Sequence, residues 1–567
     1  MSNSCPEECT GEFSPLALVD LARRLFGEGN AGRAEETLCL AIKKAPDLVQ
    51  AHILASQFAF RRWRPREALA AGLRAVNLDP KNVQAHLSVG MAWEVAGDIS
   101  RALKAYQLAE DLDKDDLSVL GKLLVNRLMI GDWTRFQELW GRIHEAMLKN
   151  GKYGLPLLYL MTISDNPAEQ IECAKWMASK LARDIQPLPA RSPSPRKKIR
   201  IGYLSNKFRD HPGATLAVEL FERHDRNYFE TFGYSIGPDD GSPLRARLEL
   251  AFDHFIELGH HPYKEAAQLI RNDGIDILID LSGYTHYQRH QILAYRPSPI
   301  QVCFLGFAAS SGAEFIDYLI ADHFVIPKDQ QVFYSEQIIY LPDCFQCNDT
   351  KRQIASYAPT RAACGLPEDG FVFTNFNSSH KILPNVFDCW MRILTAVPGS
   401  VLWLLESNLS ISANLRREAT ARGVEADRLV FGNRLPRPEY LARYRLADLF
   451  LDTRPYTAHA TASDALWAGL PILTCTGTTF ASRVAGSLLQ AVGLPELVTH
   501  SLEDYEALAI KLALEPELLL RLRQRLAAHR DEAPLFDIKR FTFNIESAYH
   551  RMFDLCISGA PPTTFSV

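Results

Sequence analysis

The sequence predicts an all-α repeat array followed by two α/β units, each a doubly wound parallel sheet with helices on both faces. Three observations predict this architecture. Small residues recur every 34 positions in the first 150 residues, and a proline-rich segment then interrupts the helical pattern. Beyond it, short apolar runs alternate with helical stretches, as in a mostly parallel sheet. A chain of 567 residues has room for about three or four domains.

The repeat period is carried by alanines, prolines and turn residues. The positions that recur with one step are Ala34, Ala68 and Ala102; Ala41, Ala75 and Ala109; Pro46 and Pro80; and Gly29, Trp63, Gly97 and Gly131. The pattern resembles the tetratricopeptide repeat, in which small alanines let paired helices pack closely. Three repeats and a partial fourth are expected over residues 12–150, and an irregular helical tail over about 136–185 is expected to cap the stack. The concave surface of such a stack suits extended peptides or other copies of the chain.

Residues 151–198 are expected to hold the cap and a linker, because four prolines fall within residues 187–195. The first α/β domain is predicted over 199–368 and the second over 369–555. The expected strands of the first are 199–204, 229–236, 275–281, 300–307 and 337–341, with helices after His211 and over 263–271. Those of the second are 371–376, 401–405, 428–431, 449–451 and 472–475. Ligands of such sheets bind at the carboxyl ends of the strands, so a site is expected in the loops between the two sheets.

Composition excludes several classes of function. The net charge of −5 is small for this length, which argues against bulk binding to nucleic acid or to anionic membranes. Met1–Phe13 lacks an export pattern, and no apolar run approaches the roughly 20 residues of a membrane span. Eleven cysteines are scattered as reduced thiols would be, and Cys344-x-x-Cys347 has no second pair at zinc spacing. We expect a soluble cytoplasmic protein.

The stretch 449–471 is the most informative part of the second unit. It reads as a buried strand, a polar loop with small residues, a short helix, and a stop at Gly469 and Pro471. This layout aims backbone N–H groups at an anion such as a phosphate. The alternative is an ordinary crossover connection with a histidine in its loop.

Six motifs occur in a fixed order along the α/β half of the chain. They are Asp280–Thr285, Arg296–Val302 with Leu305-Gly306, Asn375-Phe376-Asn377 with Lys381, Val397–Leu405, Leu466–Gly469 and Ala481–Val484. Together with the repeats they resemble the O-GlcNAc transferase family, over residues of about 199–545. The resemblance implies a GT-B fold with two Rossmann-like domains facing a cleft. It also implies an inverting transferase that moves N-acetylglucosamine from UDP-GlcNAc to serine or threonine hydroxyls of proteins.

Loss of UDP requires stabilisation of the negative charge on the leaving diphosphate. The conspicuous Asp-x-Asp, Asp111-Leu112-Asp113, falls within a repeat helix and reads as a solvated face, so no metal is expected. Protein donors must then meet the charge. We expect Lys381 to supply a cation, and the helix start at Ala460-Thr461 to supply N–H groups, a hydroxyl and its dipole. The alternative for Lys381 is a surface lysine.

Further nucleotide contacts follow from the resemblance. Asp464 would accept hydrogen bonds from the ribose hydroxyls, and His459 would pack against the phosphate. The uracil is expected near Leu435-Pro436-Arg437 and Tyr440, and Arg443 matches another nucleotide contact. The alternatives are a loop histidine at 459 satisfied by backbone, and a plain helix-face residue at 440.

His211 follows the first strand of the other sheet and matches the catalytic histidine of the family. It could take the acceptor proton or position the acceptor and sugar; the alternative is a helix-start histidine. Tyr284, Thr285, Gly306 and Phe307 are expected to border the sugar and acceptor.

The chain departs from animal members of the family at the expected UDP site and in the loop after Gly306. Ser378 stands where they carry glutamine, Ala460 replaces a threonine, and residues 307–311 lack the usual proline. These changes bear on donor affinity and turnover. Two rival functions remain, a non-catalytic repeat scaffold that senses UDP-sugars and a UDP-GlcNAc epimerase-like GT-B enzyme.

Overall fold

The computed structural model describes residues 13–191, 196–285, 288–357 and 359–567. The predictions for the N-terminal segment and for part of the linker lie outside these residues. The described chain separates into two units. One contains the repeats up to Arg127 with residues 134–155 and 260–266, and the other contains residues 128–133, 156–259 and 267–567.

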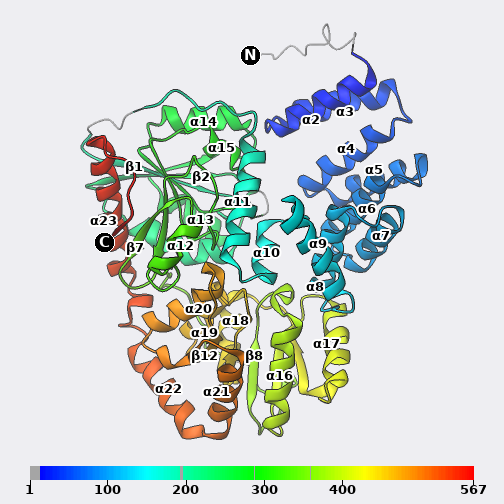
Figure 1. The fold of residues 1–567 in the computed structure, drawn as a ribbon. Coiled ribbons are helices and arrows are strands. Elements are labelled where there is room, and N and C mark those ends of the chain that lie inside the picture. Colours follow the sequence, from blue (N-terminus) through cyan, green and yellow to red (C-terminus); the bar gives the residue numbers. More distant parts are fainter. Residues whose placement is uncertain (1–12, 192–195, 286–287, 358) are drawn as a thin grey trace. The chain divides into compact units, whose positions relative to one another are not determined.

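The repeats are a series of antiparallel helix pairs (Figure 1). Their helices are α2 (Pro15–Gly27), α3 (Ala31–Lys44), α4 (Val49–Arg61), α5 (Pro65–Leu78), α6 (Val83–Val95), α7 (Ile99–Leu112), α8 (Leu117–Met129) and α9 (Phe136–Asn150). The six alanines that define the period are fully buried. A side chain no larger than a methyl group lets neighbouring helices approach closely, so these positions are buried in every repeat.

The turns of the repeats confirm the second periodic series. Gly29, Trp63, Gly97 and Gly131 all have positive φ, between 53° and 82°. This backbone conformation favours glycine, and Trp63 is the exception that adopts it with a large side chain. The imidazoles of His52 and His86 each contact the carbonyl of the repeated proline six residues earlier, at 2.7 and 2.8 Å.

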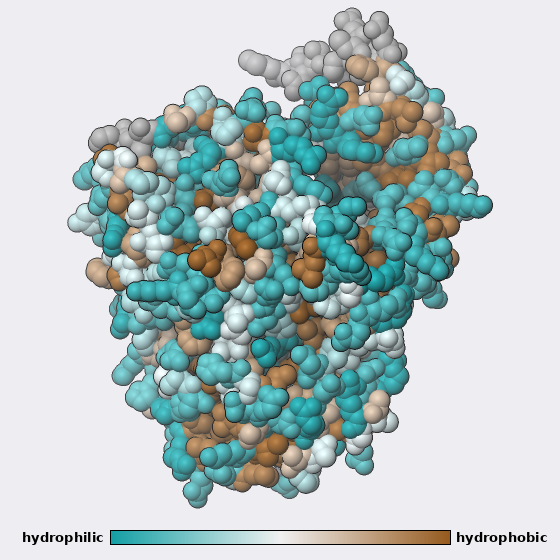
Figure 2. Space-filling view, viewed as in Figure 1, coloured by the Kyte–Doolittle hydropathy of each residue, from teal (hydrophilic) through white to brown (hydrophobic). Residues whose placement is uncertain are grey.

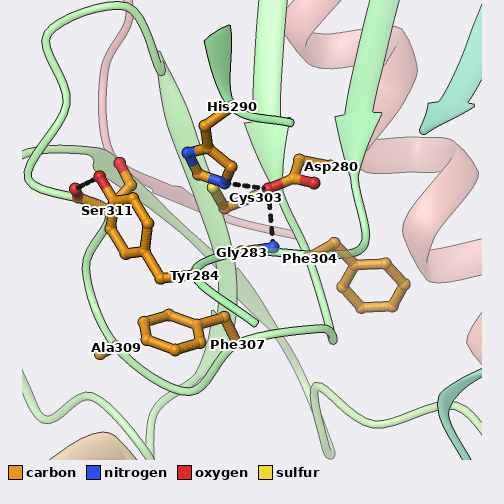
Figure 3. A pocket seen from close by; sticks show the side chains of 9 residues that line it. All are labelled: Asp280, Gly283, Tyr284, His290, Cys303, Phe304, Phe307, Ala309 and Ser311. Atoms are coloured by element: carbon orange, nitrogen blue, oxygen red, sulfur yellow. Dashed lines mark hydrogen bonds and ion pairs between the residues drawn. The ribbon is translucent and has the colours of Figure 1, made fainter. Parts of the chain in front are cut away.

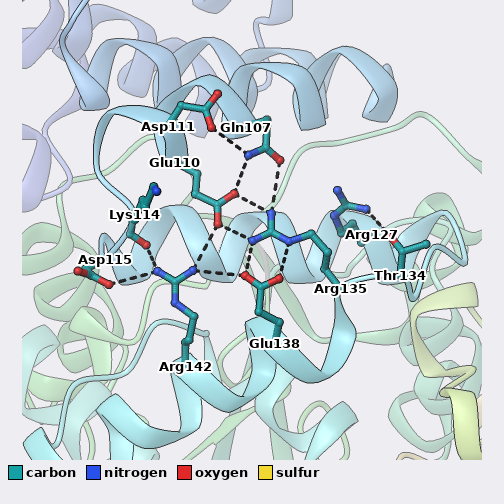
Figure 4. Close-up of polar contacts among 10 residues, drawn as sticks. All are labelled: Gln107, Glu110, Asp111, Lys114, Asp115, Arg127, Thr134, Arg135, Glu138 and Arg142. Carbon is teal, nitrogen blue, oxygen red and sulfur yellow. Dashed lines mark hydrogen bonds and ion pairs between the residues drawn. The ribbon is translucent and has the colours of Figure 1, made fainter.

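The last repeat helices are joined by a network of ion pairs (Figure 4). Glu110 of α7 accepts hydrogen bonds from both terminal nitrogens of Arg135, each at 2.7 Å, and Arg142 of α9 contacts the same carboxylate at 3.4 Å. On the face shown in Figure 2, hydrophobic side chains gather over the first repeat helices. The exposed large apolar residues on repeat helices include Leu16, Leu73, Leu108 and Leu148.

Residues 156–185, the second half of the predicted cap, do not belong to the repeat unit. Helices α10 (Leu157–Ile163) and α11 (Pro167–Ala182) belong to the unit that contains the sheets. Asp165, between them, accepts hydrogen bonds from the backbone N–H groups of Thr478 and Thr479 at 3.1 and 3.2 Å. This carboxylate lies at the start of α20 (Phe480–Ala491), where the helix dipole favours an anion.

Residues 128–133 also belong to the sheet-containing unit. The carbonyl oxygen of Met129 accepts hydrogen bonds from Ser379 Oγ at 2.7 Å and from Asn408 Nδ2 at 3.2 Å. Asn414 donates to the carbonyl of Ile130 at 2.8 Å. The turn after α8 is therefore attached to elements of the second sheet.

The first sheet is parallel and has eight strands in the order β14-β7-β6-β5-β4-β1-β2-β3. The strands are β1 (Ile199–Ser205), β2 (Phe229–Ser235), β3 (His254–Glu257), β4 (Ile277–Asp280), β5 (Ile300–Cys303), β6 (Tyr318–Asp322), β7 (Gln337–Leu341) and β14 (Phe565–Ser566). The helices along this stretch are α12 (Pro212–Arg223), α13 (Pro243–Ala251), α14 (Tyr263–Asn272) and α15 (Gln291–Ala294). The five predicted strands are confirmed, and β3, β6 and β14 were not predicted.

The C-terminal helix corrects the predicted end of the second domain. The sequence predicts residues 538–555 to belong to the second domain, but α23 (Ile538–Ile557) contributes Ile545, Tyr549 and Met552 to the core of the first sheet. The apolar face of this 20-residue helix packs against that core. Strand β14 follows and pairs with β7.

The second sheet is also parallel, in the order β10-β9-β8-β11-β12-β13. Its strands are β8 (Val372–Asn375), β9 (Val401–Leu405), β10 (Leu429–Gly432), β11 (Leu449–Leu451), β12 (Ile472–Cys475) and β13 (Val498–Thr499). Its connections contain the short 3-10 helix η3 (Ser379–Lys381) and the helices α16 (Pro384–Ala396), α17 (Leu409–Ala421), α18 (Arg437–Arg443), α19 (Ala460–Trp467), α20, α21 (Leu502–Leu514) and α22 (Pro516–His529). The five predicted strands are confirmed, and β13 was not predicted. Within the described ranges, none of the helices combines the length and apolar character needed to cross a bilayer.

Candidate active site

The loop after β11 is shaped by a buried carboxylate, Asp452. Its Oδ1 accepts hydrogen bonds from the N–H groups of Thr453 at 2.8 Å and Ala458 at 2.7 Å, and its Oδ2 accepts one from Thr474 Oγ1 at 2.7 Å. Burial raises the pKa of Asp452, whereas these donors and the nearby Lys381 act in the opposite direction. Asp452 thus folds residues 453–458 into a fixed loop ahead of α19.

Lys381 reaches this loop from η3. Its Nζ donates to the carbonyl oxygen of Thr457 at 3.0 Å and lies 3.9 Å from the centre of the Tyr456 ring. Burial lowers the pKa of Lys381, and Asp452 counteracts this effect. The amine lies among the loop residues that precede α19, which argues against the alternative of a surface lysine.

His459 is the residue immediately before α19. Its ring stacks on Tyr456 with centroids 4.7 Å apart, and Nε2 contacts the carbonyl oxygen of Ala481 at 3.1 Å. Burial and the proximity of Lys381 lower the pKa of His459 to about 3. The neutral ring therefore packs beside the helix start, and Ala460 and Thr461 are the first residues of α19. The first N–H groups of a helix have no partner within the helix, so this end offers donors to an anion.

Asp464 lies on α19 between two arginines. Its Oδ1 accepts a hydrogen bond from Arg352 Nη1 at 2.9 Å, and its Oδ2 lies 3.8 Å from Arg437 Nη1. Arg437 Nη2 is also 3.8 Å from Oδ1 of Asp210, the residue before His211. The side chain of Arg437 therefore lies near both the loop after β1 and helix α19, as expected for a site between the two sheets.

The predicted uracil region contains a buried arginine. The guanidinium of Arg443 lies 3.8 Å from the Phe376 ring centre and 4.8 Å from that of Tyr440. Nη1 donates to the carbonyl oxygen of Asn433 at 2.8 Å, whereas Nε and Nη2 have no hydrogen-bond partner among the described residues. A buried donor without a partner is costly, so Arg443 is a candidate for contact with a ligand. Leu435 and Pro436 are exposed in the loop before α18, and Ser378 is exposed at the start of η3.

His211 caps α12 through its side chain. Nδ1 accepts a hydrogen bond from the N–H of Gly213 at 3.0 Å. Burial, followed by the nearby cations Lys207, Arg209 and Arg437, lowers the pKa of His211 to about 3. A neutral imidazole that accepts at Nδ1 carries its proton on Nε2, so Nε2 is a donor. The helix-start interpretation and a role in the site are thus compatible.

The loop after β5 lies beside β4. A Cβ on Gly306 would fall 1.8 Å from the carbonyl oxygen of Leu281, so this position requires glycine. Lys207 donates to the carbonyl oxygen of Gly306 at 3.1 Å, and Thr285 Oγ1 donates to that of Ser282 at 2.8 Å. Burial lowers the pKa of Lys207 to about 8.

Tyr284 and Phe307 line a small pocket at the ends of β4 and β5 (Figure 3). The hydroxyl of Tyr284 donates to the carbonyl oxygen of Ser311 at 2.5 Å. The rings of Tyr284 and Phe307 pack in a T-shaped arrangement with centroids 5.7 Å apart. In the same pocket His290 Nε2 contacts Asp280 Oδ2 at 2.9 Å. Tyr284 supports the loop from behind rather than presenting its hydroxyl to solvent.

Sequence reasoning missed Asp452, Lys207 and Arg352. Asp452 directly follows a predicted strand, so its position was a usable signal. Lys207 lies four residues before His211 in the loop after β1. Arg352 lies 112 residues from its partner Asp464 and has no local signal.

Comparison with known proteins decides the family. The model of glycosyl transferase family 41 matches residues 179–358 and 353–545, more than half of the chain. The chain belongs to glycosyl transferase family 41.

This family 41 chain has relatives in Arabidopsis thaliana and Caenorhabditis elegans. It is 39% identical over 386 residues to the probable UDP-N-acetylglucosamine–peptide N-acetylglucosaminyltransferase SEC of Arabidopsis thaliana, covering 67% of this chain and 40% of the relative. It is 29% identical over 477 residues to the UDP-N-acetylglucosamine–peptide N-acetylglucosaminyltransferase of Caenorhabditis elegans, covering 64% of this chain and 41% of that one. The family 41 chain thus spans about two fifths of the length of these relatives.

A solved structure matches the family 41 chain over nearly its whole length. A mutant of the Thermobaculum terrenum O-GlcNAc transferase is 28% identical, with a TM-score of 0.71, and the match covers 98% of this chain and 100% of that one. The fold is accordingly a tetratricopeptide-type repeat array followed by the two Rossmann-like domains of a GT-B protein.

Proposed function

We propose that this family 41 protein transfers N-acetylglucosamine from UDP-GlcNAc to serine or threonine hydroxyls of proteins, with inversion and without a metal ion. The observation that carries the proposal is the grouping of Lys381, the start of α19 and the His211 loop. Lys381 contacts the loop that leads into α19, and Arg437 lies 3.8 Å from both Asp210 and Asp464. The relatives named as peptide N-acetylglucosaminyltransferases support this choice of donor and acceptor.

The leaving diphosphate would lie against Lys381 and the start of α19. A cation about 4 Å from a phosphate oxygen is worth roughly 4 kcal/mol at an effective dielectric of 20. The N–H groups at Ala460 and Thr461 and the Thr461 hydroxyl add donors that need no reorganisation. The anion would also restore the pKa of Lys381, because an opposite charge favours the protonated amine.

The nucleoside would occupy the region between α18 and α19. Asp464 would accept from the ribose hydroxyls, while Tyr440 and the two unpartnered nitrogens of Arg443 would face the uracil with Leu435, Pro436 and Arg437. Ser378 would border the phosphate. His459 would contact the phosphate through its neutral ring, since a pKa of about 3 leaves it uncharged at neutral pH.

His211 would act as a hydrogen-bond donor that positions the acceptor or the sugar. Its Nδ1 accepts from Gly213, so the proton of the neutral ring is on Nε2 and this nitrogen cannot also take a proton from the acceptor. Gly306 and Phe307, supported by Tyr284 and Thr285, would border the sugar and acceptor.

The repeats would guide the peptide acceptor, and their exposed apolar residues support association of copies of the chain. A cytoplasmic location and the absence of nucleic-acid partners stay predictions.

The decisive experiment incubates the pure protein with radiolabelled UDP-GlcNAc and a cell lysate. Label in protein, released by β-elimination, supports the transferase. Free epimerised sugar would instead indicate the epimerase-like enzyme, and saturable UDP binding without product would indicate the sensing scaffold. Full transfer in excess EDTA is expected, and loss of transfer that Mg²⁺ restores would contradict the metal-independent mechanism.

A further inference from the structure

Arg352 contacts the carboxylate that is expected to bind the ribose. It lies in the connection between β7 of the first sheet and β8 of the second. Its Nη1 donates to Asp464 Oδ1 at 2.9 Å and to Ser463 Oγ at 3.3 Å. The side chain of Arg352 is 1% exposed and that of Asp464 is 8% exposed.

The guanidinium is itself held in place from several directions. Its Nε donates to the carbonyl oxygen of Asp349 at 2.9 Å, and its carbon lies 5.1 Å from the Trp467 ring centre. The indole N–H of Trp467 donates back to the carbonyl oxygen of Arg352 at 3.3 Å. Asp349 is anchored by Arg247 of α13 through two contacts of 2.7 and 2.9 Å. Arg352 therefore has little freedom to follow a moving carboxylate.

The two oxygens of Asp464 have different surroundings. Oδ1 is occupied by Arg352, whereas Oδ2 lies 3.8 Å from Arg437 Nη1, which is beyond hydrogen-bond distance. Oδ2 therefore keeps acceptor capacity on the side of the His211 loop, which Arg437 also approaches.

The charge of the Asp464 carboxylate, as well as its orientation, depends on Arg352. Burial raises the pKa of Asp464, and Arg352 is the first of the neighbours that lower it, followed by Arg437. Burial raises the pKa of Tyr440 of α18, and the negative charge of Asp464 adds to this effect. A protonated Asp464 would present a donor at one oxygen and lose part of its acceptor strength.

We propose that Arg352 is a positioning residue for nucleotide recognition, which occupies Oδ1 of Asp464 and directs Oδ2 to the ribose hydroxyls. The inference rests on the proposed function, because it takes a UDP-sugar as the ligand. Selectivity for a ribonucleotide would thus depend on a residue that need not touch the nucleotide.

The test compares the binding of UDP and of 2′,3′-dideoxy-UDP by calorimetry. In the wild-type chain, UDP should bind about 10- to 100-fold more tightly, the scale of hydrogen bonds to a carboxylate. In Arg352→Met the ratio should fall to about threefold or less. Arg352→Lys keeps the charge but lacks the planar guanidinium group with its several N–H donors, and should give an intermediate ratio.

Lys351→Met is the matched control. Lys351 is the neighbouring cation in the same segment, 54% exposed, and pairs with Glu222 at 2.6 Å. It should keep the wild-type ratio. Thermal unfolding and binding stoichiometry establish the folded fraction of each variant.

The outcomes separate the two proposals. Wild-type discrimination that persists in folded Arg352→Met, or in Arg352→Lys if the methionine variant does not fold, overturns the inference. Tight UDP binding by the wild type without discrimination also overturns it, since Asp464 would then not bind the ribose. Failure of the wild type to bind UDP at all contradicts the proposed function instead.

Discussion

At the scale of single residues, two amines of the site have a pKa lowered by burial. Lys207 donates to the carbonyl oxygen of Gly306 and Lys381 to that of Thr457, at 3.1 and 3.0 Å. An ammonium group has three N–H donors, so a single carbonyl leaves donor capacity for an anionic ligand. Because the effective dielectric around a buried amine is low, its attraction to a diphosphate is stronger than that of a solvated lysine.

Replacing Lys381 by alanine should reduce kcat by about 10²- to 10³-fold, the cost of losing one transition-state donor. The change removes the cation next to the leaving group and leaves the loop held by Asp452 in place. Steady-state transfer assays with purified protein measure the effect. Lys511→Ala, at an exposed position on α21, is the control and should match the wild type. Near-normal turnover of Lys381→Ala would contradict the assignment.

The donor role of His211 predicts a difference between two substitutions. His211→Ala should lower kcat far more than it lowers UDP affinity, whereas equal losses would indicate a structural role. His211→Gln retains an N–H donor and should keep at least about tenfold more activity than His211→Ala. If His211 were the general base, glutamine and alanine would be equally inactive. The two kcat values, measured with UDP affinity for each variant, decide between these roles.

At the scale of elements, the start of α19 carries one hydroxyl fewer than the resemblance implies. Ala460→Thr restores a hydroxyl beside the expected phosphate and should tighten UDP binding by about 5- to 10-fold, as one added hydrogen bond would. Calorimetry with UDP measures the change. Thr461→Val removes the neighbouring hydroxyl and should weaken binding. Unchanged affinity in both variants would place the phosphate elsewhere.

The repeat helices and their turns respond oppositely to the same change. Gly97 has φ of 80° and open space around a Cβ, so Gly97→Ala meets backbone strain alone. It should destabilise the repeats by about 1 kcal/mol or more. Gly141 lies within α9, also with open space, and Gly141→Ala should stabilise them by about 1 kcal/mol. Urea unfolding followed by circular dichroism compares the two, and changes of the same sign would contradict this account.

At the scale of the whole molecule, histidines whose protonation is suppressed make stability depend on pH. His211 and His459 have a folded pKa of about 3, against about 6.5 in an unfolded chain. Between these values the unfolded state binds more protons, so stability rises with pH and is lost as pH falls below about 6.5. His224, buried beside Glu546, also has a pKa lowered by burial.

The expected result is a lower Tm at pH 5.0 than at pH 7.5, with a smaller difference in His459→Gln. His500→Gln, at an exposed position, is the control and should keep the wild-type difference. A Tm that does not change over this interval would contradict the suppressed protonation.

Strands such as β1, β4 and β12 were predictable, because a parallel strand covered on both faces reads as a continuous apolar run. β3 has four residues, as β4 has, but none of them is fully buried, and β13 has only two residues, so neither carries that signal. β6 is buried throughout and could have been predicted from Tyr318–Asp322. The loop before α19 was predicted from its residue types, but the contact between Lys381 and Thr457 spans 76 residues. Only the fold brings such pairs together.

The turn after α8 has a practical consequence for dividing the chain. The carbonyl of Met129 holds Ser379, two residues before Lys381. A truncated protein that begins at the linker, near residue 199, would retain both sheets but lack this acceptor and helices α10 and α11. A shortened protein that is meant to keep both sheets intact should therefore start upstream of Leu128, so that it includes the end of α8 and the turn that follows.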